Sequence, residues 1–274
     1  MDVSGKTKIV GIFGNPIEHT LSPFMHNSAF KTLGLDICYI AFRVLPEGLP
    51  HAVKAISELN LLGVNITVPH KENVIPLLDE VDKEAAFIGA VNTVVNSDGK
   101  LKGYNTDGRG FMNSLSENRI STEGKIILVI GAGGASRAIS YYLSEKASKL
   151  FLYDTNTQKA EKLTSDLQKI RSNVFLTDNI GVIDKPHILI NATPLGLKPG
   201  DPLPLNPDFI TSDTTVCDLV YKNTRFLQEA ANKGAKTLDG SGMLLWQGVL
   251  AFELWTGIKP PVDIMRQALL SKIK

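Results

Sequence analysis

Short apolar runs alternate along the chain with segments in which apolar residues recur at helical spacing. The first four runs cover residues 8–13, 37–42, 62–68 and 91–95. Between the second and the third run, the spacing of Leu49, Val53, Ile56 and Leu59 is that of one helix face. Strands separated by helices in this way are typical of βαβ units with a mainly parallel sheet.

A second series of apolar runs predicts a second α/β unit. Its members cover residues 126–130, 150–153, 174–176, 187–191, 215–221 and 235–238. The polar stretch from Asn113 to Lys125 separates the two series, and we expect the chain to pass there from one unit to the other. In the first series, Asp98-Gly99 predicts a tight hairpin turn and one antiparallel strand at the edge of that sheet.

Composition narrows the class of protein. The 274 residues are 43% hydrophobic and 21% charged, which excludes disordered and fibrous proteins. The 29 basic and 28 acidic residues are interspersed, so we expect a small-molecule partner rather than nucleic acid or an anionic membrane. The two cysteines form no metal-ligand or redox motif. Neither a signal peptide nor a membrane-spanning run is visible, so the sequence predicts a cytoplasmic protein.

A glycine-rich turn follows the apolar run at residues 126–130. It reads Gly131-Ala132-Gly133-Gly134-Ala135 and leads into a segment of helical spacing. Strand, glycine turn and helix in this order suit a pyrophosphate, because Gly131 permits a tight turn and Gly133 permits close approach of the backbone. The helix N-terminus adds free N–H groups and a positive dipole end. The dinucleotide fingerprint G-x-G-x-x-G/A, counted from Gly131, has Ser136 at its sixth position in this chain, so Ala138 is expected to provide the close helix–strand packing. The alternative is a glycine turn that serves packing alone.

The next apolar run ends at Asp154, about twenty residues past the glycines, where an acid can bind the ribose 2′-hydroxyl of the adenosine. Asp154 and the following Thr155 favour NAD over NADP, because a carboxylate repels a 2′-phosphate and no guanidinium follows to bind it. Lys159 is the nearby cation. The alternative is that Asp154 only caps a turn or a helix.

Polar side chains also follow the strands of the first series. Thr20 and Ser22 precede Pro23, and Ser22-Pro23 is interpreted as the N-cap and first residue of a helix, whose N-terminal donors suit a carboxylate. Asn65, Thr67 and Lys71 lie at the end of the 62–68 run, where open α/β sheets bind ligands. Lys71 is predicted in the first turn of a helix, where the dipole disfavours its charged form and favours acid–base chemistry. The alternatives are a simple helix cap and a solvated lysine.

Three further polar residues suit a polyol ring. Asn92 and Asp107 lie where apolar runs are interrupted by amides, hydroxyls and one carboxylate, and Asp107 also fits the N-cap of the next helix. Gln247 lies in an otherwise apolar helix over residues 242–255, so it needs a partner, either a backbone carbonyl or a ligand hydroxyl.

Together these motifs closely resemble the shikimate dehydrogenase family over nearly the whole chain. The strings TLSPFMHN, NITVPHK, GAVNT, GYNTD, GAGGA, NATPLG and QGVLAFELWTG stand here in family order. The resemblance implies a substrate domain of residues 1–112 and 242–274, a Rossmann-type doubly wound dinucleotide domain of residues 113–241, and a cleft between them. It also implies reversible NAD(P)H-dependent reduction of 3-dehydroshikimate to shikimate in aromatic amino-acid biosynthesis, without a metal, by a monomer or homodimer.

The resemblance assigns roles to individual residues. Lys71 would be the acid–base residue at the C3 oxygen, paired with Asp107. Thr20 and Ser22 would bind the substrate carboxylate, with Thr67 supporting the site. The ring hydroxyls would be bound by Asn65, Asn92, Asp107 and Gln247. Tyr221 would lie near the substrate, and the nicotinamide beside Gly240, Gly242 and Met243.

Two departures from the family pattern leave alternatives open. Members commonly have Asn-Arg-Thr where this chain has Asp154-Thr155-Asn156, so the arginine usual for the NADP phosphate is absent. Thr20 stands where serine is usual, and its extra methyl group, with Asp154, motivates an NAD-linked quinate/shikimate dehydrogenase as the main alternative. A dinucleotide-sensing regulator would have no need for Lys71 with Asp107, and the Ser22 string argues against a folate-linked dehydrogenase.

Overall fold

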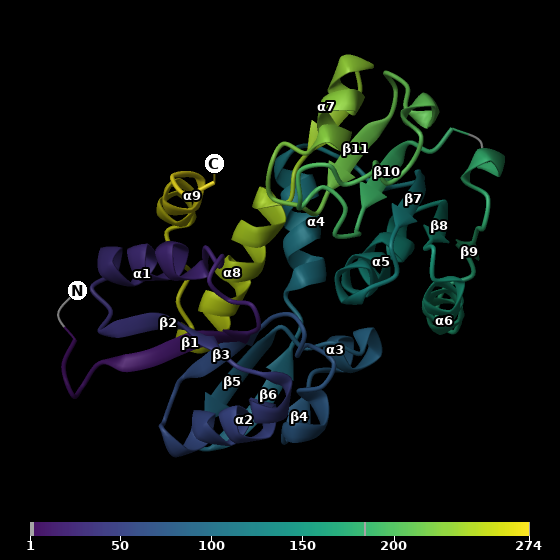
Figure 1. Ribbon diagram of the computed structural model, residues 1–274. Helices are drawn as coiled ribbons and strands as arrows, with labels where there is room; N and C mark the ends of the chain where they lie inside the picture. The colour runs from purple at the N-terminus through teal and green to yellow at the C-terminus, as the bar shows by residue number, and fades with distance from the viewer. Residues whose placement is uncertain (1–2, 184, 274) are drawn as a thin grey trace. The chain divides into compact units, whose positions relative to one another are not determined.

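The computed structural model describes residues 3–183 and 185–273 and divides the chain into two units. Unit 1 comprises Met1–Gly110 and Leu245–Lys274, and unit 2 comprises Phe111–Leu244. The chain leaves unit 1 within helix α4 (Asp107–Glu117) and returns to it within helix α8 (Ser241–Thr256). Each unit is built on a sheet with helices along it, as the alternating apolar runs predict (Figure 1).

The unit 1 sheet has six strands in the order β2-β1-β3-β5-β6-β4. Their bounds are β1 Lys8–Gly14, β2 Ile37–Arg43, β3 Gly63–Ile66, β4 Glu80–Val81, β5 Thr93–Ser97 and β6 Lys100–Tyr104. The predicted hairpin is confirmed between β5 and β6, where Asp98 and Gly99 have φ of 53° and 90°, as a type I′ turn requires. The prediction of an antiparallel edge strand is wrong, because β5 pairs antiparallel with both β3 and β6 inside the sheet. The edge is the two-residue β4, which is too short to form an apolar run.

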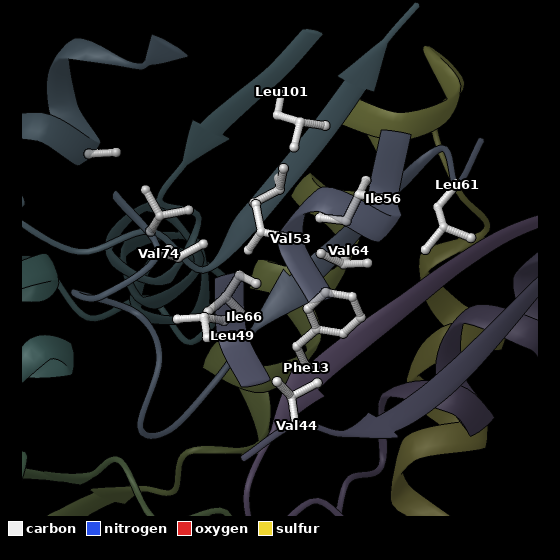
Figure 2. Close-up of a cluster of buried hydrophobic side chains, with 13 residues drawn as sticks. Phe13, Val44, Leu49, Val53, Ile56, Leu61, Val64, Ile66, Val74 and Leu101 are labelled. Atoms are coloured by element: carbon white, nitrogen blue, oxygen red, sulfur yellow. The ribbon is translucent and has the colours of Figure 1, made fainter. Parts of the chain in front are cut away.

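Helix α2 (Leu49–Glu58) covers one face of this sheet. Leu49, Val53 and Ile56 pack in one buried cluster with Val64 and Ile66 of β3 (Figure 2). Burial of five such side chains stabilises the unit by about 1.5–3 kcal/mol each. The residue between Val64 and Ile66 therefore points to the opposite face, because side chains alternate along a strand.

The opposite face carries α1 (Ser22–Thr32) and α8. His26 of α1 stacks on Tyr39 of β2 with ring centroids 4.5 Å apart, and Phe252 and Trp255 of α8 join this aromatic cluster. Trp255 also donates its indole N–H to the Val94 carbonyl at 3.0 Å. Although α8 is mostly apolar, no helix in the described ranges is both long and apolar enough to cross a membrane. The remaining elements are α3 (Lys83–Ile88), α9 (Val262–Leu270), η1 (Pro46–Gly48) and η2 (Ile75–Leu77).

Unit 2 is a doubly wound sheet in the order β12-β11-β10-β7-β8-β9, with parallel pairing throughout its described strands. The strands are β7 Ile126–Ile130, β8 Lys149–Tyr153, β9 Val174–Leu176, β10 Ile188–Asn191, β11 Thr215–Asp218 and β12 Lys236–Leu238. The helical elements are α5 Gly134–Lys146, α6 Thr157–Gln168, α7 Arg225–Asn232, η3 Ile180–Val182 and η4 Pro207–Phe209. This strand order is that of dinucleotide-binding folds, which bind their ligand where the order reverses, here between β7 and β10. The predicted Rossmann-type fold is therefore confirmed.

Two helix predictions need correction. Ser22 is the first residue of α1 rather than its N-cap, because the carbonyl of Leu21 already accepts the N–H of Met25. No α-helix begins at Lys71; turns lead from it into η2. Pro76 has no N–H to donate and its ring would clash with the carbonyl four residues earlier, so a helix through this segment is unfavourable.

Candidate active site

Lys71 and Asp107 form an ion pair in unit 1. The Lys71 ammonium donates to Asp107 Oδ2 at 2.6 Å, and the two side chains are 23% and 8% exposed. No α-helix begins at Lys71, so Lys71 does not stand in the first turn of a helix as predicted. The pair instead presents a proton donor held by a carboxylate at the carboxyl end of the sheet, which suits proton transfer to a ligand oxygen.

Asp107 is the first residue of α4 rather than its N-cap. Its N–H is bound by Asn105 Oδ1 at 3.0 Å, while its second carboxylate oxygen accepts from Asn92 Nδ2 at 2.9 Å. Asn92 also donates to Thr106 Oγ1 at 2.9 Å and accepts the Thr106 N–H at 2.8 Å. Both N–H groups of Asn92 are thus engaged, and the residue orients the carboxylate that binds Lys71.

Asn65, on β3, is held by a second set of contacts. Its Nδ2 donates to Thr93 Oγ1 at 3.0 Å and to the Asn92 carbonyl at 3.1 Å. Its Oδ1 accepts the Tyr39 hydroxyl at 2.7 Å. An amide oxygen has two acceptor positions, so one remains for a ligand hydroxyl.

Tyr39 is a site residue that the sequence reasoning missed, because an aromatic residue in a predicted strand is usually part of a core. Its ring is buried, and burial raises the pKa of its hydroxyl, against the smaller effect of a hydrogen bond with Ser22. The Tyr39 hydroxyl therefore stays protonated and links Ser22 with Asn65. A buried tyrosine needs a partner for its hydroxyl, which is the signal that would have pointed to this link.

Thr20, Ser22 and Thr67 lie near the carboxyl ends of β1 and β3. The Ser22 N–H is 3.4 Å from Thr20 Oγ1, and the Ser22 side chain is buried. Thr67 donates its N–H to the Phe13 carbonyl at 2.9 Å. A Cβ on Gly14 would lie 2.4 Å from Thr67 Cγ2, so glycine is required for this close approach.

Two buried histidines support this part of unit 1. His70 bonds the Val44 carbonyl through Nε2 at 2.7 Å and so fixes the turn that carries Lys71. His26 has no hydrogen-bond partner on either ring nitrogen among the described residues, and burial lowers the pKa of its imidazole to about 3. It is therefore a neutral packing residue above the Tyr39 ring.

Gln247 and Gly110 approach closely within unit 1. A Cβ on Gly110 would lie 2.7 Å from the Gln247 backbone nitrogen, so α4 and α8 can meet here only because residue 110 has no side chain. Gln247 is 9% exposed, as its position in an apolar helix predicts.

The glycine turn of unit 2 lies at the carboxyl end of β7. Gly131 has φ of +107°, and a Cβ there would lie 2.9 Å from the Ala192 backbone. A Cβ on Gly133 would meet no heavy atom within 4 Å, so this side of the turn is open to a ligand. Helix α5 begins at Gly134 without a side-chain cap, which leaves N–H groups for an anion. Ser136 and Ala138 are both fully buried, so small side chains at both positions allow close packing.

Asp154, directly after β8, faces this turn. Its Oδ2 accepts the Ala132 N–H at 2.7 Å, and its Oδ1 accepts the Asn156 N–H at 2.8 Å and lies 3.5 Å from Thr155 Oγ1. Arg137, the arginine of α5, pairs with Asp166 at 3.0 Å. The Asp154 carboxylate thus organises the glycine turn from the end of β8.

Three further predicted site residues belong to unit 2. A Cβ on Gly240 would lie 2.1 Å from the Leu219 carbonyl oxygen, so the segment after β11 packs directly on Gly240. Tyr221 follows in that segment and is half-buried, and Met243 is buried in the first turn of α8. No group of three or more His, Cys, Asp and Glu side chains within residues 3–183 and 185–273 could hold a metal ion.

A dinucleotide fold with an open glycine turn, together with a lysine–carboxylate pair on a second α/β unit, defines an NAD(P)-dependent oxidoreductase. Comparison with known proteins specifies the family. Models of the shikimate dehydrogenase substrate binding domain and of the shikimate 5′-dehydrogenase C-terminal domain match residues 12–94 and 240–270. The chain is 44% identical to the shikimate dehydrogenase (NADP(+)) of Carboxydothermus hydrogenoformans, covering 98% of this chain and 99% of that protein.

Solved structures agree with this relationship. A crystal structure of shikimate dehydrogenase in complex with NADP+ is 38% identical, with a TM-score of 0.93, and covers 100% of this chain and 98% of its own. The shikimate 5-dehydrogenase of Listeria monocytogenes in complex with shikimate and NAD is 37% identical, with a TM-score of 0.90, over 97% and 98% of the two chains. The chain belongs to the shikimate dehydrogenase family.

Proposed function

We propose that this protein catalyses the reversible reduction of 3-dehydroshikimate to shikimate with NAD(P)H. The observation that carries the proposal is the contact of 2.6 Å between the Lys71 ammonium and Asp107. Reduction of a ketone needs a hydride at carbon and a proton at oxygen, and a nicotinamide supplies the hydride when bound. Lys71 donates the proton to the C3 oxygen, and its neutral amine is then reprotonated from solvent. Asp107 keeps the ammonium directed at the substrate.

The remaining polar residues would bind the substrate. Ser22 and Thr20 would bind the carboxylate at the start of α1, and Thr67 would support them. Asn65 offers its free acceptor position to a ring hydroxyl, and Asn92 acts by orienting Asp107. Gln247 and Tyr221 would complete the set of hydroxyl contacts. We place the reaction in the cytoplasm, where cysteines such as Cys38 and Cys217 stay unpaired.

The dinucleotide would bind with its pyrophosphate on the turn from Gly131 to Ala135, with Gly240 and Met243 on the nicotinamide side. For the adenosine end, Asp154 favours NAD over NADP. Its carboxylate is held in place by the Ala132 and Asn156 N–H groups, so it cannot swing away from a 2′-phosphate without breaking both bonds.

The test is a steady-state assay of shikimate and quinate oxidation, each with NAD and with NADP. We expect shikimate with NAD to give the highest kcat/KM of the four pairs. A higher value with NADP would overturn the role of Asp154 and leave the reaction unchanged. A higher value with quinate would replace shikimate as the substrate, and no turnover of either acid would refute the proposed function.

A further inference from the structure

A buried carboxylate in unit 2 has no part in the proposed reaction. Asp218 ends β11 and Asn191 ends β10, and the two residues are direct partners in the parallel ladder. Their side chains are 1% and 0% exposed, and Asn191 Nδ2 donates to Asp218 Oδ1 at 3.0 Å. Burial of a carboxylate is unfavourable in free energy unless hydrogen-bond donors surround it. The donors around Asp218 therefore show which segments this carboxylate fixes.

Two of those donors come from the segment that follows β11. Asp218 Oδ1 accepts the Val220 N–H at 3.0 Å, and Oδ2 accepts the Thr224 hydroxyl at 2.7 Å. Thr224 also caps α7 by accepting the Leu227 N–H at 3.4 Å. Burial raises the pKa of the Asp218 carboxyl, while the three donors oppose that rise. Residues 219–224 are therefore closed into a loop with both ends on one carboxylate.

Asn191 holds a second loop against the first. Its Nδ2 donates to the Leu195 carbonyl at 3.1 Å as well as to Asp218, and its Oδ1 accepts the Thr193 hydroxyl at 2.6 Å. Gly196, at φ of +102°, brings this loop so close that a Cβ would lie 3.0 Å from Thr224 Cγ2. Residues 192–196 and 219–224 are thus fixed as one piece beside the glycine turn.

Tyr221 lies between the two donors of the Asp218 loop, one residue after Val220 and three before Thr224. The loop of residues 219–224 also packs against Gly240 through the backbone of Leu219. This contact leaves the loop no room to shift towards Gly240. We infer that Asp218, through Val220 and Thr224, is a positioning residue that holds Tyr221 in place for the substrate. This inference rests on the proposed function, in which Tyr221 contacts the substrate.

The test is a matched pair of substitutions at Thr224. Thr224→Val removes the hydroxyl that binds Asp218 but keeps the shape of the side chain, whereas Thr224→Ser keeps the hydroxyl. We expect Thr224→Val to lower kcat/KM for shikimate about tenfold, mainly through KM, because a loop that shifts weakens an oriented contact. Thr224→Ser should retain most of the activity.

A double-mutant cycle with Tyr221→Phe separates positioning from general stability. If Asp218 acts through Tyr221, Thr224→Val should lower kcat/KM for shikimate by less than about twofold in the Tyr221→Phe background. An equal loss in both backgrounds, or an equal loss for Thr224→Ser and Thr224→Val, would overturn the inference. If the unsubstituted protein failed to oxidise shikimate, the proposed function would fall, and this inference with it.

Discussion

Acidification is expected to destabilise unit 1 through one histidine, His26. Its imidazole is fully buried among Tyr39, Phe252 and Trp255, and burial lowers its pKa from 6.5 to about 3. Between these two values the unfolded chain binds a proton that the folded protein excludes. The contribution of neutral His26 to the free energy of unfolding is therefore fully present above pH 6.5 and decreases as the pH drops towards 3.

The magnitude follows from linkage. Each pH unit between the two pKa values costs about 1.4 kcal/mol, so lowering the pH from about 7.5 to about 5 removes about 2 kcal/mol. Both tryptophans, Trp246 and Trp255, belong to unit 1, so urea unfolding followed by tryptophan fluorescence reports on this unit alone. The free energy of unfolding should be measured at both pH values.

His26→Leu removes the titrating group and replaces it with an apolar side chain of similar volume. The variant should lose about 2 kcal/mol less than the unsubstituted protein between the two pH values, because all other titrating groups are shared. His51→Gln, at an exposed position of α2, is the matched histidine substitution, and its free energy of unfolding is measured at the same two pH values. Equal losses in the unsubstituted protein and His26→Leu would refute the reasoning.

The site yields three further predictions. Lys71→Ala should lower kcat by about 10²–10⁴ with shikimate binding largely retained, as measured by single-turnover kinetics and equilibrium titration; near-normal turnover would exclude Lys71 as the proton donor. Asp154→Asn keeps an acceptor for the Ala132 N–H but removes the charge, so the ratio of kcat/KM for NADP to that for NAD should rise about tenfold or more, and an unchanged ratio would contradict the proposed repulsion. Gly131→Ala should destabilise unit 2 and weaken cofactor binding by about tenfold or more, as followed by fluorescence of bound reduced cofactor. Gly124→Ala is the control, because Gly124 also has positive φ but open space around it, and equal effects of the two substitutions would count against the steric argument.

Strands were predictable where they are buried on both faces. The run at residues 126–130 coincides with β7, which is buried from Ile127 to Ile130, because a continuous apolar run is typical of a central strand in a parallel sheet. The place of β5 within its sheet was not predictable, because strand order depends on contacts between distant segments. The prediction of a helix at Lys71 is wrong. Pro76 lies five residues after Lys71, so the residues between them contain no proline that would have argued against a first helical turn.

The candidate site was predictable as residue types but not as contacts. The residue pattern singled out Lys71 and Asp107 separately, only the family resemblance paired them, and the structure gives the bond between them. Tyr39 and Asp218 were missed for the same reason: each sits in or at the end of an apolar run, where a single polar atom has little effect on the pattern. Their roles follow from the partners of that atom, which only the folded chain brings together.

The order of the two units along the chain bears on how the protein folds during synthesis. Unit 2 is one continuous stretch, so all its strands are available once Leu244 has left the ribosome. Unit 1 must wait for its last segment, because Trp255 closes its core by bonding the Val94 carbonyl across 161 residues. Until then the apolar face of its sheet, including Tyr39, stays uncovered by α8. Synthesis of unit 1 therefore starts before that of unit 2 but is completed after it, and unit 1 is the one exposed to aggregation in the interval.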